Sequence, residues 1–322
     1  MALFDNIDPA TSEHWLTVPG DWRRPAVPEQ YPILWDAQRG YGQVWPRPDA
    51  SEIAEFYRVP YYTHSAGSSA AGTEHSLPQR VLTKLSWLAD RGVEADRAWW
   101  QQAMGPAPRR VLEIGCGSGW TLELLSSLGH RVTGVEPDPS AVQASRSRGL
   151  RVLPGTGEAL PEELAGEQFD AVIFMHVLEH VVHPTQALRN ALRLLAPGGI
   201  LVCEVPNNDC LARERFGEFW FWLDAPRHLN FFTEKSLRTL FQSLELEVMS
   251  IDHHGYCRQF APGWQSVQRR IARIFGRERD RRVAETAYWT FLFRTALAGR
   301  RWKYDSLRLV ARPGNGGADR FP

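Results

Sequence analysis

One stretch, Val111–Trp120, constrains the fold of this chain more than any other. Its first four residues are apolar except for Glu113, which is typical of a buried strand, and a helical pattern runs from about Ser118 to Leu128. Three glycines separate the two: Gly115, Gly117 and Gly119. Because glycine lets the backbone approach a ligand closely, a strand, a glycine turn and a helix N-terminus together predict a nucleotide-type crevice.

Beyond Arg109, predicted strands alternate with predicted helices, which is typical of a doubly wound, mostly parallel sheet in an α/β fold. The strands are expected at residues 111–114, 131–136, 151–153, 169–175, 200–205, 246–251 and 305–312. Thr233 is expected to cap one of the helices between them. Residues 257–304 interrupt the alternation with arginine-rich helical sequence, so we predict a helical insertion before the last strand.

The sequence before the glycine loop has a different character. Residues 1–65 are rich in Pro and Trp and show little periodicity, and so many aromatic side chains need burial. A short helix is expected at residues 49–57 with Ser51 as its cap, followed by a small-residue linker at 65–72 and a helical pattern at 77–104. We therefore predict two parts: an N-terminal cap over residues 1–105 and a main domain over 106–322.

Composition excludes several classes of protein. The 37 Lys and Arg residues balance 37 Asp and Glu residues, so the total charge gives no support for a nucleic-acid partner. The four cysteines lack Cys-x-x-Cys spacing, which favours reduced thiols. No basic, apolar export signal and no membrane-spanning segment is visible, so we expect a cytoplasmic protein without integral membrane association.

Further motifs follow the glycine loop along the chain. Glu136 ends the second strand, His176–His180 (His-Val-Leu-Glu-His) follows the fourth, Leu195–Gly199 precedes the fifth, and Pro226–Leu229 (Pro-Arg-His-Leu) comes later. In this order they resemble one bacterial branch of the class I S-adenosylmethionine (SAM)-dependent methyltransferases, over residues 109–252 and the last strand. The resemblance implies a Rossmann-like sheet of seven strands with the last strand antiparallel, and SAM as methyl donor.

The resemblance assigns the SAM contacts to particular positions. The glycine loop would wrap the methionine part, the acid that ends the second strand would hold the ribose hydroxyls, and the loop after the third strand would line the adenine. The residues expected to bind SAM are Glu113, Gly115, Cys116, Gly117, Gly119, Glu136, Pro137, Gly157, Glu158 and His176. The family often has Asp where this chain has Thr156, so adenine recognition would depend on a hydroxyl and backbone groups.

His176 is the predicted general base. It would lie at the carboxyl end of the fourth strand, where open α/β sheets bind their ligands, and a neutral imidazole can take the proton of a hydroxyl acceptor near pH 7. The alternative is that His176 only contacts SAM. Arg227 and His228 are predicted acceptor contacts, because they should overhang the same crevice, where Arg227 could meet an anionic group.

No resident metal is predicted. Relatives often carry paired Cys-x-x-Cys zinc motifs before the aromatic phrase that here begins at Tyr41, but residues 33–40 contain no cysteine. A divalent metal held by carboxylate and imidazole groups is the alternative. Its ligands would be His176, Glu179 and His180, with His183 or His228 added.

The predicted activity is methyl transfer from SAM to a small-molecule or glycan acceptor, most simply a hydroxyl. Two alternatives remain: an NAD-dependent oxidoreductase, which Trp120 in place of a third spaced glycine argues against, and a SAM-binding protein without catalysis. The basic and aromatic segment 265–302 could rest on a membrane surface, but a solvated helix pair is the simpler interpretation because acids interrupt the positive run. The oligomeric state is not predicted.

Overall fold

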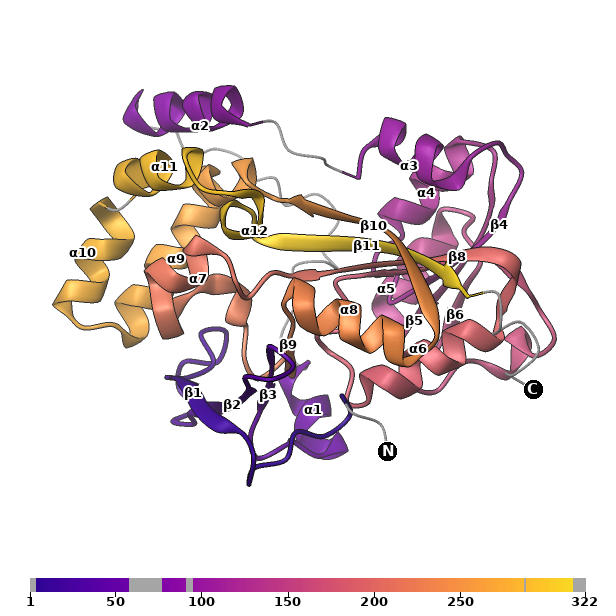
Figure 1. Cartoon of the computed structure of the whole chain (residues 1–322), viewed down its shortest axis with the longest axis horizontal. Coiled ribbons are helices and arrows are strands. Elements are labelled where there is room, and N and C mark those ends of the chain that lie inside the picture. Colours follow the sequence, from indigo (N-terminus) through magenta and orange to yellow (C-terminus); the bar gives the residue numbers. More distant parts are fainter. Residues whose placement is uncertain (1–3, 58–76, 91–94, 287, 315–322) are drawn as a thin grey trace.

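A computed structural model describes residues 4–57, 77–90, 95–286 and 288–314. The linker predicted at residues 65–72 lies outside these ranges. Most of the described chain surrounds one large sheet, and a smaller sheet lies beside it (Figure 1).

The large sheet has seven strands in the order β10-β11-β8-β7-β4-β5-β6. Their bounds are β4 Arg110–Ile114, β5 Arg131–Glu136, β6 Val152–Pro154, β7 Phe169–Met175, β8 Leu195–Pro206, β10 Leu246–His254 and β11 Ser306–Pro313. β4 to β8 pair in parallel, whereas β11 runs antiparallel to both β8 and β10. The prediction of a Rossmann-like, mostly parallel seven-stranded sheet with an antiparallel last strand is confirmed.

Helices cover both faces of this sheet, because alternate side chains of its central strands are apolar on both sides. On β7, Ile173 packs with Trp100 on one face, and Phe174 packs with Leu188 and Phe241 on the other. The helices that contribute these side chains or flank the parallel strands are α3 Arg97–Met104, α4 Trp120–Ser127, α5 Pro139–Ser147, α6 Pro184–Arg193 and α8 Glu234–Ser243. Thr233 caps α8 as predicted, since its hydroxyl accepts from the backbone N–H of Ser236.

The strand order reverses at β4, which pairs with β5 on one side and β7 on the other. Connections leave β4 and β7 in opposite directions there, so the carboxyl ends of these strands flank a crevice. The glycine loop at residues 115–119 follows β4 directly and lies at this switch point.

The N-terminal region contains strands that the sequence does not indicate. β1 (Glu13–Val18), β2 (Tyr31–Asp36) and β3 (Tyr41–Val44) form an antiparallel sheet that β9 (Asn230–Phe231) completes. The strands are short and interrupted by proline and bulky aromatics, so no clear alternation is visible in the sequence. Since β9 belongs to the second half of the chain, this sheet joins the N-terminal region to the Pro-Arg-His-Leu loop.

The predicted helix at residues 49–57 is present as α1, Ala50–Phe56. Its cap is Asp49 rather than the expected Ser51, because the Asp49 carboxylate accepts from two backbone N–H groups and Glu52 closes a capping box. The pattern expected as one helical region over 77–104 contains two helices, α2 (Leu77–Ala89) and α3. α3 lies within the predicted cap, yet it packs into the core of the large sheet.

The insertion before β11 is helical as predicted. It comprises the 3-10 turn η5 Cys257–Phe260 and the helices α9 Pro262–Phe275, α10 Glu278–Thr286, α11 Tyr288–Ala296 and α12 Arg300–Lys303. These helices extend from one end of the large sheet next to α7 (Leu211–Phe216), and α2 lies against α11 (Figure 1). The aromatic run 219–222 forms two further 3-10 turns, η3 Gly217–Phe219 and η4 Phe221–Leu223, whose aromatic side chains are mostly buried.

Candidate active site

The glycine loop has a backbone that only glycine adopts without cost. Gly115, Gly117 and Gly119 have φ angles of 69°, 51° and 78°, in the left-handed region. A Cβ on Gly115 would lie 2.4 Å from Cγ2 of Val177, and a Cβ on Gly119 would lie 2.7 Å from Cδ1 of Leu150. The loop therefore needs glycine both for its positive φ angles and for its close packing against Val177 and Leu150.

Glu136 lies beside this loop, as the sequence predicts. Its Oε2 accepts from the backbone N–H of Gly117 at 2.8 Å, and its Oε1 accepts from that of Asp138 at 3.0 Å. Each carboxylate oxygen has two acceptor positions, so these bonds orient the group without using all of its capacity. The structure thus brings Glu136 and the glycines together; Pro137 continues the turn into α5.

Glu113, at the end of β4, and Cys116, in the loop itself, are both buried. Burial raises the pKa of Glu113 to about 8, so its carboxyl group is mostly protonated at pH 7. The Glu113 side chain bonds to Thr121, and among the described residues its buried Oε2 has no partner. The Cys116 side chain packs with Leu122 and Val142, so this residue can reach a ligand only through its backbone.

The loop predicted to line adenine contains Gly157, which is buried, and Glu158. Backbone N–H groups orient the Glu158 carboxylate. It accepts from the backbone N–H of His183 at 2.8 Å and of Val182 at 3.3 Å, just before α6. Asn190 on α6 donates to the carbonyl oxygens of Gly157 and Glu158, so the loop is fixed against that helix.

His176 follows β7 in a left-handed conformation, with φ at 55°, which costs a non-glycine residue about 1–2 kcal/mol. Its Nδ1 lies 3.2 Å from Oε1 of Glu179 and its Nε2 lies 2.9 Å from Oε1 of Glu204. The ring stacks on Trp222, with 4.8 Å between the centroids. His176 is therefore held at both ring nitrogens and on one face.

This environment does not fit the predicted role of His176 as general base. Burial alone would lower the pKa of the ring, but the bonds to Glu179 and Glu204 outweigh it and raise the pKa to about 9. The imidazolium donates from both nitrogens at pH 7, so no lone pair is available to accept a proton. A neutral base at position 176 was expected because the sequence does not show that Glu179 and Glu204 both bond to the imidazole ring.

Glu204 is the partner that sequence reasoning missed. It lies near the end of β8, and its Oε2 accepts from Nε of Arg308 at 2.8 Å, while its Oε1 lies 3.1 Å from Nε2 of His254. The signal was present in the sequence, because Glu204 is the one acid in the apolar run 200–205. A charged residue in a buried central strand requires such partners.

Arg227 was predicted to contact the acceptor, but its side chain is completely buried and already paired. Its guanidinium donates to Asp21 at 2.6 and 3.0 Å and to Asp224 at 3.2 Å. Arg23 also donates to Asp224. Arg227 therefore joins the N-terminal region to the Pro-Arg-His-Leu loop instead of facing a ligand.

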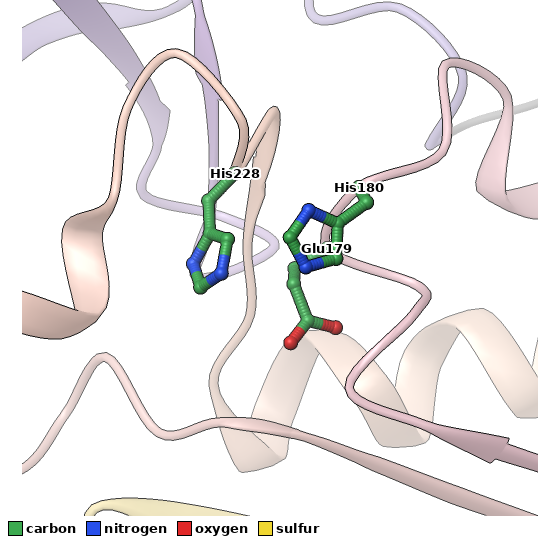
Figure 2. Close-up of side chains that lie close together, drawn as sticks. All are labelled: Glu179, His180 and His228. Carbon is green, nitrogen blue, oxygen red and sulfur yellow. The ribbon is translucent and has the colours of Figure 1, made fainter. Parts of the chain in front are cut away.

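His228 and His180 pack edge to face beside this charge cluster, with 4.6 Å between their ring centroids (Figure 2). Nδ1 of His228 donates to the carbonyl oxygen of Trp222 at 2.8 Å, which leaves its Nε2 as the acceptor nitrogen. Burial lowers the pKa of His228 to about 4, and the pKa of His180 likewise falls to about 4. Both rings are therefore neutral at pH 7. Tyr57, at the end of α1, reaches His180 Nδ1 with its hydroxyl at 3.0 Å.

These two histidines and Glu179 could hold a metal ion. Figure 2 shows the three side chains converging, and their ligand atoms lie within 4.8 Å of one another. Two imidazoles and a carboxylate suit several divalent cations, and Oε2 of the buried Glu179 has no partner among the described residues. This set differs from the predicted alternative, because His176 acts as a partner of Glu179 and His183 is not in the group.

Comparisons with known proteins identify the family of this chain. A family model described as a methyltransferase domain matches residues 90–251, just over half of the chain. The ubiquinone biosynthesis O-methyltransferase of Methylobacterium sp. (strain 4-46) is 32% identical over 176 residues, which cover 50% of this chain and 65% of the relative. The protein of the same name from Xanthomonas oryzae pv. oryzae (strain PXO99A) is 41% identical over 156 residues, which cover 43% of this chain and 64% of the relative.

The matched region is thus less than two thirds of the length of these relatives. Among solved structures, coclaurine N-methyltransferase is similar over 81% of this chain and 81% of its own, with 15% sequence identity and a TM-score of 0.49. Nothing about the methyl acceptor follows from a similarity at that level. The match to the family model, over more than half of the sequence, shows that this chain belongs to the class I SAM-dependent methyltransferases.

Proposed function

We propose that this enzyme transfers the methyl group of SAM to a hydroxyl oxygen of a small molecule or glycan. Membership of the family supports SAM as the methyl donor. The relatives described above are named O-methyltransferases, which supports oxygen as the accepting atom. A neutral histidine cluster at the ligand-binding edge of the sheet, where a hydroxyl proton can be taken up, is the structural observation that carries the proposal.

In this proposal the cofactor lies along the carboxyl ends of β4 and β5. The glycine loop would wrap the methionine part, where its φ angles keep side chains away from the ligand. Glu136, oriented by two backbone N–H groups, would accept from the ribose hydroxyls. Glu113, whose Oε2 has no partner within the described part of the chain, would turn its carboxyl group toward the positively charged methionine end.

His228 is the proposed acceptor of the hydroxyl proton. The bond from its Nδ1 to the Trp222 carbonyl sets the tautomer, so Nε2 carries the lone pair. In the reaction, the acceptor oxygen forms a bond to the methyl carbon as the carbon–sulfur bond breaks, the sulfonium becomes a neutral thioether, and the hydroxyl proton moves to His228 Nε2. Holding oxygen, carbon and sulfur in line supplies much of the rate enhancement in such displacements.

The cluster of Glu179, His180 and His228 also has the donor set of a divalent-cation site. A cation there would lower the pKa of a bound hydroxyl and help its proton to leave. Chelation separates the two routes. Full activity after EDTA treatment and dialysis supports direct proton transfer to His228, whereas activity that is lost and then restored by a divalent cation places the cluster in a metal role.

The replacement His228→Ala tests the proposal. We expect kcat to fall by about 100-fold or more, as for loss of a general base, while the Kd for SAM stays nearly constant. Product formation would be followed by mass spectrometry, as the gain of one methyl group by a hydroxyl compound in an extract of the host. His14→Ala is the control, because His14 is an exposed histidine on β1. An equal loss of SAM affinity and turnover in His228→Ala would contradict the assignment.

A further inference from the structure

Exposed apolar side chains are concentrated on one part of the molecule. Among the described residues, nine of the twelve exposed large hydrophobic side chains lie on α2 and on the segment of α11 and α12, so their distribution is far from even. They are Leu77, Val81, Leu85, Trp87, Leu88, Trp289, Phe293, Leu297 and Trp302. We call these nine residues the apolar face. Scattered exposed hydrophobics are normal on proteins, but a contiguous set indicates a binding surface.

On α2 the pattern is that of an amphipathic helix turned outward. Leu77, Val81 and Leu85 are spaced by four residues and so lie in one row along the helix. Leu77 is 74% exposed, whereas Leu82 and Ser86 on the opposite side are buried. Most of the apolar surface of this helix therefore points away from the protein.

α11 repeats the same pattern. Trp289, Phe293 and Leu297 are again spaced by four residues, and Phe293 is 70% and Leu297 74% exposed. Phe291 and Thr295 form the buried side. α2 and α11 contact each other, so the two rows lie on neighbouring helices from segments about 200 residues apart in the sequence (Figure 1).

Specific contacts hold α2 in this orientation. The Thr83 hydroxyl donates to the carbonyl oxygen of Phe260 at 3.2 Å on the inner side of the helix. At its end, Asp90 pairs with Nζ of Lys303 at 2.8 Å. Polar groups therefore hold the helix in place, and its exposed leucine side chains lie outside the core.

The charge around the apolar face is net positive. Residues 77–89 and 288–303 contain no Asp or Glu. Of their basic residues, Arg294, Arg301 and Lys303 pair with acids of other segments, whereas Arg80, Lys84 and Arg300 form no salt bridge among the described residues. By contrast, acids are interspersed with the arginines of α9 and α10, which the sequence also suggested for a membrane role, and two ion pairs form there, Arg273–Glu285 and Arg282–Glu278. The net positive, apolar surface thus lies on α2, α11 and α12 rather than on the arginine-rich helices.

We propose that the apolar face binds the surface of an anionic lipid bilayer. Leucine and phenylalanine side chains would enter the acyl boundary, the three tryptophans would lie at the headgroup level, and the flanking arginine and lysine side chains would meet lipid phosphates. None of the helices in the described ranges is long and apolar enough to cross a bilayer, so the contact is peripheral. This attachment is additional to the proposed methyl transfer and does not depend on it.

A second copy of the chain fits this face less well. A two-fold symmetric interface places the same patch of each copy against the other, which would bring Arg80, Lys84 and Arg300 of the two copies toward one another and cause repulsion between like charges. An anionic surface complements both the apolar rows and their charge. We therefore take a lipid bilayer as the occupant.

Binding to lipid vesicles tests the proposal. We expect the whole chain to sediment with vesicles of phosphatidylcholine and phosphatidylglycerol, less with phosphatidylcholine alone, and less at high salt. The double replacement Phe293→Ser with Leu297→Ser should lower the partition coefficient by at least about tenfold, because two large apolar side chains leave the lipid. Arg80→Gln should lower it by about fivefold on anionic vesicles only, the effect of one basic residue near a charged membrane.

Met249→Ser is the matched control, because Met249 is 52% exposed but lies on β10, outside the apolar face. It should bind vesicles like the unaltered chain. SAM binding by each variant reports that the fold is intact. The proposal is overturned if anionic vesicles do not bind the chain, if the double replacement binds them as well as Met249→Ser, or if the double replacement instead abolishes a dimer detected by light scattering.

Discussion

The two sides of the crevice are built in different ways. On the proposed cofactor side, backbone N–H groups of nearby residues orient Glu136, and the three glycines with positive φ angles lie within one short segment. On the proposed acceptor side, buried charged side chains bring together residues far apart in the chain. Arg227 bonds to Asp21 across 206 positions, and Tyr57 meets His180 across 123.

Because of this difference, we expect the two sides to tolerate different kinds of amino-acid substitution. A site made of backbone groups is sensitive to added volume and to conformation, because a new Cβ moves the loop itself. A site made of buried ion pairs is sensitive to the loss of a charge, because the remaining partner stays in a medium of low dielectric constant without compensation. The predictions below test that contrast, beginning with the largest effect.

Loss of the Arg227 charge should destabilise the whole protein. In Arg227→Met, Asp21 and Asp224 would remain buried with their principal partner removed, so we expect the free energy of unfolding to fall by about 3–5 kcal/mol. Urea denaturation followed by circular dichroism measures the change. Arg148→Met is the control, since Arg148 pairs with Glu123 at 3.0 Å where both side chains are about one third exposed, and it should cost less than about 1 kcal/mol. Equal losses in the two variants would show that the acceptor side does not depend on buried charge.

The pH dependence of stability should report Glu113 on the cofactor side. Burial raises its pKa from 4.5 to about 8, so the folded state binds more protons than the unfolded state between these values. Stability of the protein without SAM should therefore fall as pH rises from about 4.5 to about 8, by about 4 kcal/mol from this residue. Glu113→Gln should remove that component from the profile of unfolding free energy against pH. A profile identical in the two proteins would mean that Glu113 ionises freely in the fold.

A methyl group on the glycine loop should weaken SAM binding without unfolding the protein. In Gly115→Ala the new Cβ would clash with Val177, and the positive φ would be strained, so we expect the Kd for SAM to rise by about 30- to 100-fold, or about 2–3 kcal/mol. Gly149→Ala is the matched control. Gly149 has a φ of 80° but nothing within 4 Å of its added Cβ, so it should lose about 1 kcal/mol of stability and keep its SAM affinity. If calorimetry gave similar Kd values for SAM in the two variants, SAM binding would not depend on close packing around the glycine loop.

The cofactor side was predictable because its information is local. The spacing of Gly115, Gly117 and Gly119 and the acid at the end of the second strand lie within one strand–helix–strand unit, and the structure brings them together. The large sheet followed from the alternation of strands and helices for the same reason. In the N-terminal region, by contrast, the small sheet needs β9 from residues 230–231 to complete it, so no local pattern could reveal that pairing.

The roles of the charged residues on the proposed acceptor side depend on tertiary contacts that the sequence does not show. A motif such as His176–His180 places histidines at the end of a strand, but it does not show that Glu204 on β8 faces His176, or that Asp21 and Asp224 enclose Arg227. These neighbours reverse the expected functions: His176 becomes a cation, and Arg227 becomes a structural link. Two neutral rings remain, His180 and His228, and His228 was predicted only as an acceptor contact.

The sequence by itself determined the fold class, the family and the position of the cofactor loop, because each depends on hydrophobic periodicity and on glycines close together in the chain. Only the tertiary structure decided which titratable groups carry charge and which helices present apolar rows to the outside. Protonation depends on burial and on partners brought from distant segments, and exposure depends on which face of a helix the rest of the protein covers. Neither property is a function of local sequence.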